Sequence, residues 1–173
     1  MQPKSPSHRD GSPQTEKEQR IGEFIRQNVS ECLGQVSIML VVRSAASPVA
    51  RAVNAVLGES HQRCAVRMIV IGDDWDAGVP ATDQSAGEMR ILRNPRLLHA
   101  HEQLVIGDKA TWFGDSMWGD PLKRDAYESY SAGDADGARM ARTTFERLWH
   151  AAEPYHAFSP GQAAAPVCAG LPR

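Results

Sequence analysis

Hydrophobic residues recur at helical spacing near both ends of the chain. Residues 21–34 carry apolar side chains three or four apart and close on Gly34, a common helix terminator, so they predict a helix. Residues 134–152 (DADGARMARTTFERLWHAA) predict a second, amphipathic helix. The inner face of the first helix is expected to be Ile21, Phe24, Ile25, Val29, Leu33. The inner face of the second is expected to be Ala138, Ala141, Phe145, Leu148, Trp149.

Two uninterrupted apolar runs between these helices predict buried strands. They are VSIMLVV (36–42) and AVRMIVIGDD (65–74), and such runs are typical of strands covered on both faces. The segment between them, SPVARAVNAVLGES, predicts a helix with Ser47 as N-cap and Pro48 at its first position. The buried face of this helix is expected to be Val49, Ala52, Val53, Val56. A strand–helix–strand order predicts two parallel strands joined by a right-handed crossover.

The later part of the chain predicts short antiparallel strands. After a polar loop at 76–87, EMRIL (88–92) is a short strand. HEQLVIGD (101–108) ends in a turn, and ATWFGDS (110–116) is expected to return as its hairpin partner. The fold class is therefore α/β, a sheet flanked by helices.

The two ends of the chain differ from this pattern. Residues 1–19 contain mainly Pro, Ser, Gln and charged side chains, which predicts a disordered tail. Residues 153–173 are rich in Pro, Gly and Ala and predict a loose extension, leaving one domain at 20–152. The N-terminus has no apolar stretch of the kind found in secretory signals, and no apolar run approaches the ~20 residues that span a bilayer.

Composition narrows the possible partners. With 173 residues, 42% of them hydrophobic, and a formal charge of −2, the chain is a globular domain without a general basic field for nucleic acid or anionic membrane. Cys32, Cys64 and Cys168 form no CxxC pair, so neither a zinc knuckle nor a disulfide framework is expected. Scattered cysteines favour a reducing, cytoplasmic location.

The segment HAHEQ raises the question of a catalytic or metal site. On one strand His99, His101 and Gln103 would point to the same face. A solvated strand face would show the same pattern, and this plain interpretation is favoured. A zinc site would need a third ligand such as Asp108, and no HExxH pattern is present, so no metal is expected.

The spacing that follows His101 resembles a known motif. The order His101-x-Gln103-x4-Asp108-x6-Asp115-Ser116 is similar to the HKD motif of the phospholipase D superfamily, HxKx4Dx6GSx2N. The His, the Asp and the Ser are in register. Gln103 stands where the motif has Lys, Asp115 where it has Gly, and Gly119 where it has Asn, so the motif is degenerate.

The resemblance extends over about residues 20–150. The order of predicted elements matches one half-domain of the family, the last helix carries the Phe-x-x-x-Trp pattern as Phe145 and Trp149, and Glu128 stands at the family's downstream glutamate. The resemblance implies a phospholipase D-like sandwich, a mixed sheet flanked by helices. In that family a histidine attacks a phosphodiester to give a phosphohistidine, and a second histidine protonates the leaving oxygen.

The family's chemistry needs two motifs, and this chain has one. The resemblance therefore implies a homodimer with a shared site, without cofactor or metal. It makes His101 the nucleophile, Gln103 the replacement of the phosphate-holding lysine, and Ser116 a phosphate contact. Asp108 would support the fold around the motif and Glu128 would orient the partner's histidine. Each also has a plainer interpretation, as a turn tip for Asp108, a loop start for Ser116 and an exposed helix-start acid for Glu128.

Gln103 decides between two functions. Glutamine donates a hydrogen bond but carries no charge, and losing one fixed donor to a transition state commonly costs ~10²–10³ in rate. Four cations nearby in the sequence could bind the phosphate and so partly replace the lysine. They are Lys109, Lys123, Arg124, Arg96. We therefore expect a degenerate domain with weak or no catalysis that binds a phosphate-containing ligand, nucleic acid or a protein partner. The alternative is a metal-independent phosphodiesterase or nuclease.

Aromatic residues follow the motif. Trp112, Trp118, Tyr127 and Tyr130 lie among basic residues, a composition that can form a stacking platform for single-stranded nucleic acid. The same segment contains several aspartates, which argues against such a platform. The favoured interpretation places the tryptophans in the core or in a dimer interface.

Overall fold

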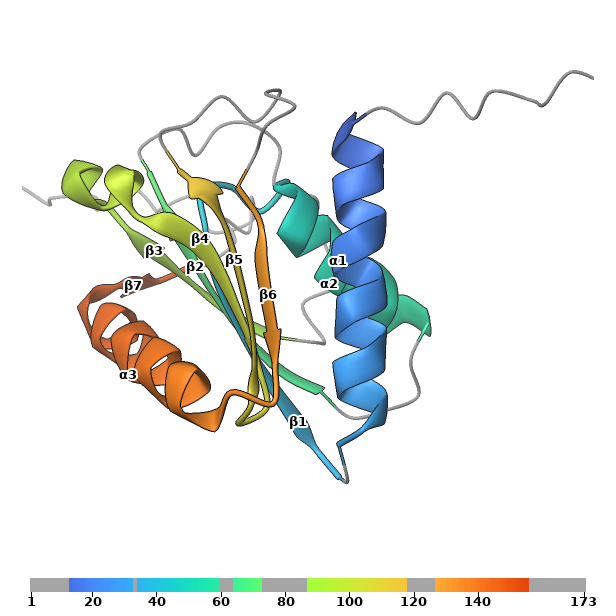
Figure 1. The fold of residues 1–173 in the computed structure, drawn as a ribbon. Coiled ribbons are helices and arrows are strands. Elements are labelled where there is room, and N and C mark those ends of the chain that lie inside the picture. Colours follow the sequence, from blue (N-terminus) through green and yellow to red (C-terminus); the bar gives the residue numbers. More distant parts are fainter. Residues whose placement is uncertain (1–12, 33, 60–63, 73–86, 118–126, 156–173) are drawn as a thin grey trace, which may run out of the picture.

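In the computed structural model, one mixed sheet lies between α1 and α2 on one face and α3 on the other (Figure 1). The structure describes residues 13–32, 34–59, 64–72, 87–117 and 127–155. The elements are α1 (Pro13–Ser30), β1 (Val36–Val42), α2 (Pro48–Glu59), β2 (Cys64–Ile71), β3 (Gly87–Leu92), the 3₁₀ helix η1 (Pro95–His99), β4 (His101–Ile106), β5 (Ala110–Ser116), β6 (Ser129–Ala132), α3 (Ala135–Ala151) and β7 (Glu153–Pro154). This arrangement confirms the predicted α/β fold.

The strand order is β6-β5-β4-β1-β2-β3-β7. Strands β1, β2 and β3 are parallel, whereas β4, β5, β6 and β7 join through antiparallel pairs. The predicted parallel unit and the predicted hairpin are both confirmed. Because Val41 is opposite Gln103, the start of β4 lies at the edge where the parallel strands end. This is the edge at which open α/β sheets usually bind their ligands.

Alternation along the central strands separates two cores. Side chains such as Ile38 and Leu40 of β1 point to the α1/α2 face, where they pack with Ile21 and Val53. Their neighbours point to the α3 face, where Phe145 is fully buried. The predicted N-cap of α2 is also confirmed, because the hydroxyl of Ser47 accepts the Ala50 N–H at 3.4 Å. The buried side chains of the central strands thus divide between a core under α1 and α2 and a core under α3, and the predicted inner residue Leu33 lies outside the described residues.

Helix α1 begins at Pro13, so the prediction of disorder up to residue 19 is wrong for residues 13–19. The cause is tertiary rather than local. Glu18 pairs with Arg51 of α2 at 2.8 Å, and Lys17 lies 3.9 Å from Glu128. The charges that suggested a tail thus hold the first turns to the body of the protein. Residues 1–12 lie outside the described part of the chain.

The C-terminal boundary differs as well. Glu153 and Pro154 form β7, which pairs with Ile91 and Arg90 of β3, so these two residues belong to the sheet rather than to an extension. The remainder of the predicted extension, 156–173, lies outside the described residues, as does the loop at 76–86. Among the helices of the described ranges, none is long and apolar enough to cross a membrane.

His99 is not on a strand, and that prediction is wrong. It closes η1, which begins where the Asn94 side chain accepts the Arg96 N–H at 3.1 Å and Pro95 occupies the first position. The strand starts only at His101. His99 and His101 therefore do not share one strand face.

Candidate functional site

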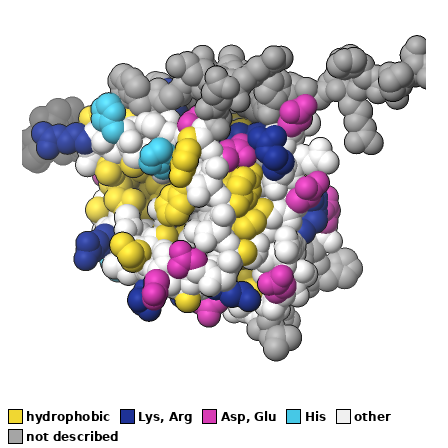
Figure 2. Space-filling view, viewed as in Figure 1, with side chains coloured by type: hydrophobic (Ala, Val, Ile, Leu, Met, Phe, Trp, Pro, Cys, Tyr) yellow, Lys and Arg dark blue, Asp and Glu magenta, His cyan; other side chains and the backbone are white. Residues whose placement is uncertain are grey.

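His101 occupies the first position of β4, opposite Ser116 at the end of β5. The side chain is exposed and lies at the carboxyl-end edge of the parallel strands. Histidine side chains are visible at the surface on this side of the molecule, next to hydrophobic ones (Figure 2). An exposed imidazole at this edge can reach a ligand in solvent.

A β-bulge in β5 shapes this corner of the sheet. Gln103 pairs with Phe113 while His101 pairs with Ser116, so one residue of β4 faces two of β5, Gly114 and Asp115. Such bulges redirect side chains and are frequent beside active sites. Gly114 has no room for a side chain, because a Cβ there would lie 2.8 Å from Cζ2 of Trp112 and closer still to Cη2. The Trp112 ring thus packs over the bulge.

The bulge also fixes the orientation of the His101 ring. Its Nδ1 lies 2.7 Å from the carbonyl oxygen of Gly114. A carbonyl only accepts, so Nδ1 carries a proton and donates it, and in the neutral ring the lone pair lies on Nε2. His101 is thus held in the tautomer that a nucleophile or a hydrogen-bond acceptor requires.

Gln103 points into the protein. It is 8% exposed, on the α3 face of the sheet, and its side-chain amide donates to the backbone carbonyl of Ala141 at 3.0 Å. The position at which the resembled motif has lysine therefore serves here as a contact between β4 and α3. The side-chain amide of Gln103 therefore does not point to the exposed ring of His101.

Glu102 points to the opposite face and is buried between β4 and the turn before α2. Its carboxylate accepts the backbone N–H of Arg43 at 3.4 Å. Burial raises the pKa of Glu102, the hydrogen bond from Arg43 and the charge of Lys17 oppose that rise, and the Asp115 carboxylate adds to it. Glu102 was not among the residues predicted from the sequence. The pattern that could have predicted its burial is the alternation of side chains along a strand, which places the residue after His101 on the opposite face of the sheet.

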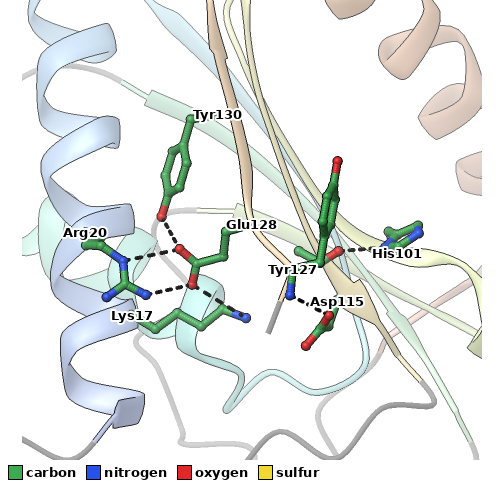
Figure 3. Close-up of polar contacts among 8 residues, drawn as sticks. Lys17, Arg20, His101, Asp115, Tyr127, Glu128 and Tyr130 are labelled. Carbon is green, nitrogen blue, oxygen red and sulfur yellow. Dashed lines mark hydrogen bonds and ion pairs between the residues drawn. The ribbon is translucent and has the colours of Figure 1, made fainter. Parts of the chain in front are cut away.

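Three further contacts lie around His101 among the described residues. The hydroxyl of Ser116 donates to the carbonyl of Leu98 at 3.2 Å, tying η1 to β5. The Tyr127 N–H donates to Oδ1 of Asp115 at 2.7 Å, and the Tyr127 ring lies 5.6 Å from the His101 ring, centroid to centroid. Figure 3 shows His101, Asp115 and Tyr127 near one another. The role of Tyr127 beside His101 was also missed.

Glu128 belongs to a separate network on the α1 side (Figure 3). Its carboxylate pairs with Arg20 at 3.0 Å and with Lys17 at 3.9 Å, and accepts the Tyr130 hydroxyl at 2.8 Å. The hydrogen bond with Glu128 raises the pKa of Arg20, while burial and then Glu128 raise the pKa of Tyr130 to about 12. Within this chain Glu128 joins α1 to the sheet and does not contact His101.

Two of the remaining predicted residues, Asp108 and Lys109, lie far from His101. Asp108 and Lys109 form the tip of the hairpin, six or more residues along β4 from His101, a span of roughly 20 Å at the usual rise of a strand. Lys109 lies there 3.6 Å from Glu31. Lys123 and Arg124 lie outside the described residues, and Arg96 is exposed on η1. Lys109 therefore cannot replace the lysine of the motif at His101.

Within the described ranges no group of three or more His, Cys, Asp or Glu side chains could hold a metal ion. Trp112 is fully buried, which confirms the core interpretation for that residue, whereas Trp118 is outside the described part. Tyr127, by contrast, is 54% exposed. Among the aromatic residues that the structure describes in this segment, Tyr127 contacts His101.

Comparison with solved structures supports the fold. NucT from Helicobacter pylori aligns with 81% of this chain and 94% of its own, with a TM-score of 0.50 and 11% identity. Nuc from Salmonella typhimurium, described as a phospholipase D family member, aligns with 78% of this chain and 90% of its own, with a TM-score of 0.50 and 10% identity. No model of a known protein family and no curated protein matches the sequence. The fold is therefore phospholipase D-like.

Proposed function

We propose that this chain is a degenerate phospholipase D-like domain that binds a phosphodiester ligand at His101 with weak or no turnover. The observation that carries the proposal is the placement of Gln103. Where the resembled motif has a lysine, this chain has a buried amide that bonds to Ala141 of α3. A transition state at His101 would therefore not receive from position 103 the positive charge that a lysine places beside the developing anion.

The bulge supports retention of binding. His101 keeps a fixed tautomer and an exposed ring, and Ser116 lies opposite it on β5. A phosphate oxygen only accepts, so His101 can contact it through Nε2 when that nitrogen also carries a proton. The neutral tautomer supports the second candidate, a metal-independent phosphodiesterase, because a free lone pair on Nε2 is what a nucleophilic histidine needs.

A homodimer is part of the proposal. The chain contains one motif, and a two-fold axis would bring a second His101 to the ligand. Light scattering on the purified full chain tests this part, and a monomer that still binds the ligand would contradict it. The cytoplasmic location expected from the scattered cysteines stays a prediction.

The test compares His101→Ala with the matched variant His99→Ala, an exposed histidine two residues away on η1. Turnover is measured on bis(p-nitrophenyl) phosphate with and without EDTA, and binding by fluorescence anisotropy with a labelled oligodeoxynucleotide. We expect no turnover above buffer, and binding that His101→Ala weakens while His99→Ala leaves it intact. EDTA-resistant turnover that His101→Ala abolishes would establish the phosphodiesterase instead. If both variants bound the oligodeoxynucleotide equally well, the ligand would not bind at His101.

A further inference from the structure

Two rings meet at the solvent-exposed end of β4. Tyr127 is 54% exposed, and its ring is tilted by 56° to the exposed ring of His101 at a centroid distance of 5.6 Å (Figure 3). Tyr130, three residues on, is arranged differently. Its ring packs edge-on against Phe24 of α1 at 5.2 Å, and its hydroxyl donates to Glu128. Tyr127 is thus the exposed tyrosine of the His101 surface, and Tyr130 belongs to the α1 side.

Tyr127 is held in place by a residue that departs from the resembled motif. Asp115 stands where the motif has glycine, and its Oδ1 accepts the backbone N–H of Tyr127 at 2.7 Å. Glycine could not make this bond, because it has no side chain. The same bulge presents the Gly114 carbonyl to His101. One local feature of β5 therefore positions both rings.

We propose that Tyr127 is a base-stacking residue, and that the phosphodiester bound at His101 belongs to a nucleic acid strand with unpaired bases. The inference rests on the proposed function, since it names the ligand of the same site. A tyrosine ring anchored through its backbone offers a flat face that every base can stack on. Bases inside a duplex already have both faces covered, so only an unpaired or extruded base can lie on Tyr127.

Charge supports stacking as a main source of affinity. The formal net charge is −2, and the α1 cations Lys17 and Arg20 are already paired with Glu128. If stacking supplies most of the affinity, binding releases few counterions, so the affinity falls only gently with salt. We expect a shallow salt dependence together with a clear preference for strands that carry bases.

The test measures anisotropy with three labelled ligands of one length, namely a single strand, an abasic strand with the same phosphodiester backbone, and a duplex. Tyr127→Ala is expected to bind the single strand roughly 5- to 150-fold more weakly, the range expected for losing one stacked base. Tyr127→Phe keeps the ring and the affinity. Tyr130→Ala is the matched control and should bind as wild type. Binding of the abasic strand should not change in any of these variants.

The anchor has its own pair of variants. Asp115→Asn keeps an oxygen acceptor for the Tyr127 N–H and should bind as wild type, whereas Asp115→Gly removes the acceptor and should weaken single-strand binding alone. Thermal unfolding of each variant verifies that it is folded.

The outcomes separate the two proposals. If wild type binds the single strand and the abasic strand, and Tyr127→Ala binds the single strand equally well, the stacking inference fails while the proposed function stands. If wild type binds neither strand, the proposed function fails and the inference fails with it. Tighter binding of the duplex than of the single strand would also overturn the inference, because a paired base cannot lie on Tyr127.

Discussion

Replacing Gln103 with lysine restores the residue of the resembled motif, and we expect it to destabilise the protein without restoring catalysis. Gln103 is 8% exposed, and its amide is engaged with the Ala141 carbonyl at 3.0 Å. A lysine there would place its ammonium under α3, with a carbonyl as partner. Removing a charged group from water into such a site is unfavourable, and the lysine would lose its proton in preference.

The cost at pH 7 has an upper bound. Deprotonating a lysine of ordinary pKa about 10.4 at pH 7 costs ~3.4 pKa units, or ~4.6 kcal/mol at 1.36 kcal/mol per unit. Partial escape of the long side chain toward solvent lowers this value, so we expect about 2–4 kcal/mol. That is a large share of the ~5–15 kcal/mol by which domains are stable. Gln103→Met, of similar length and uncharged, should lose only about 1 kcal/mol for the missing hydrogen bond.

Urea unfolding from pH 7 to pH 10 measures this difference. The folded variant would hold a neutral lysine and the unfolded chain a charged one, so the unfolded state binds more protons. The stability of Gln103→Lys relative to Gln103→Met should therefore rise with pH. Turnover on bis(p-nitrophenyl) phosphate should stay at the level of the wild type. If Gln103→Lys matched Gln103→Met in stability at pH 7 and gained turnover, position 103 would face the site rather than the core, and the reasoning would fail.

Two other predictions concern the residues around the bulge. Gly114→Ala should destabilise by about 1–3 kcal/mol, because its Cβ would meet the Trp112 ring, whereas Gly58→Ala, which meets nothing within 4 Å in α2, should be neutral or stabilise by up to ~1 kcal/mol. Urea unfolding checks the pair, and equal effects would contradict the packing of Trp112 over the bulge. Burial raises the pKa of Glu102, so the folded state binds more protons than the unfolded state. The contribution of Glu102 to the free energy of unfolding therefore falls as the pH rises from the unfolded pKa of about 4.3 through the higher pKa of the folded state. Glu102→Gln should therefore gain stability relative to wild type over that pH range, and a constant difference between the two would show that Glu102 does not titrate differently on folding.

The regular part of the fold could be predicted from the sequence because its signals are local. The run VSIMLVV needs no partner to be recognised as a buried strand, and Ser47 with Pro48 marks the start of α2 whatever packs above it. The hairpin was equally predictable from its turn. These elements have one interpretation each, and the structure confirms them.

The misses share a different cause, which is dependence on distant residues. The first turns of α1 look like a polar tail until Arg51 and Glu128 are brought to Glu18 and Lys17. The two residues of β7 have almost no strand signal and form a strand because the edge of β3 accepts them. Glu128 matched a motif position, but Arg20 of α1 determines what it contacts here. No local pattern contains these pairings.

The site itself follows from alternation along β4. His101 begins the strand at the open edge of the sheet and stays exposed. Glu102 then enters the α1/α2 side and Gln103 the α3 side, and both are covered. A lysine at position 103 would need solvent or a negative charge around its ammonium on the α3 side of the sheet. In this chain the backbone carbonyl of Ala141 in α3 covers that position instead. A glutamine at position 103 is therefore consistent with its surroundings, and under the proposed function we expect chemistry at this edge to depend on His101 and on the groups that the bulge of β5 places beside it.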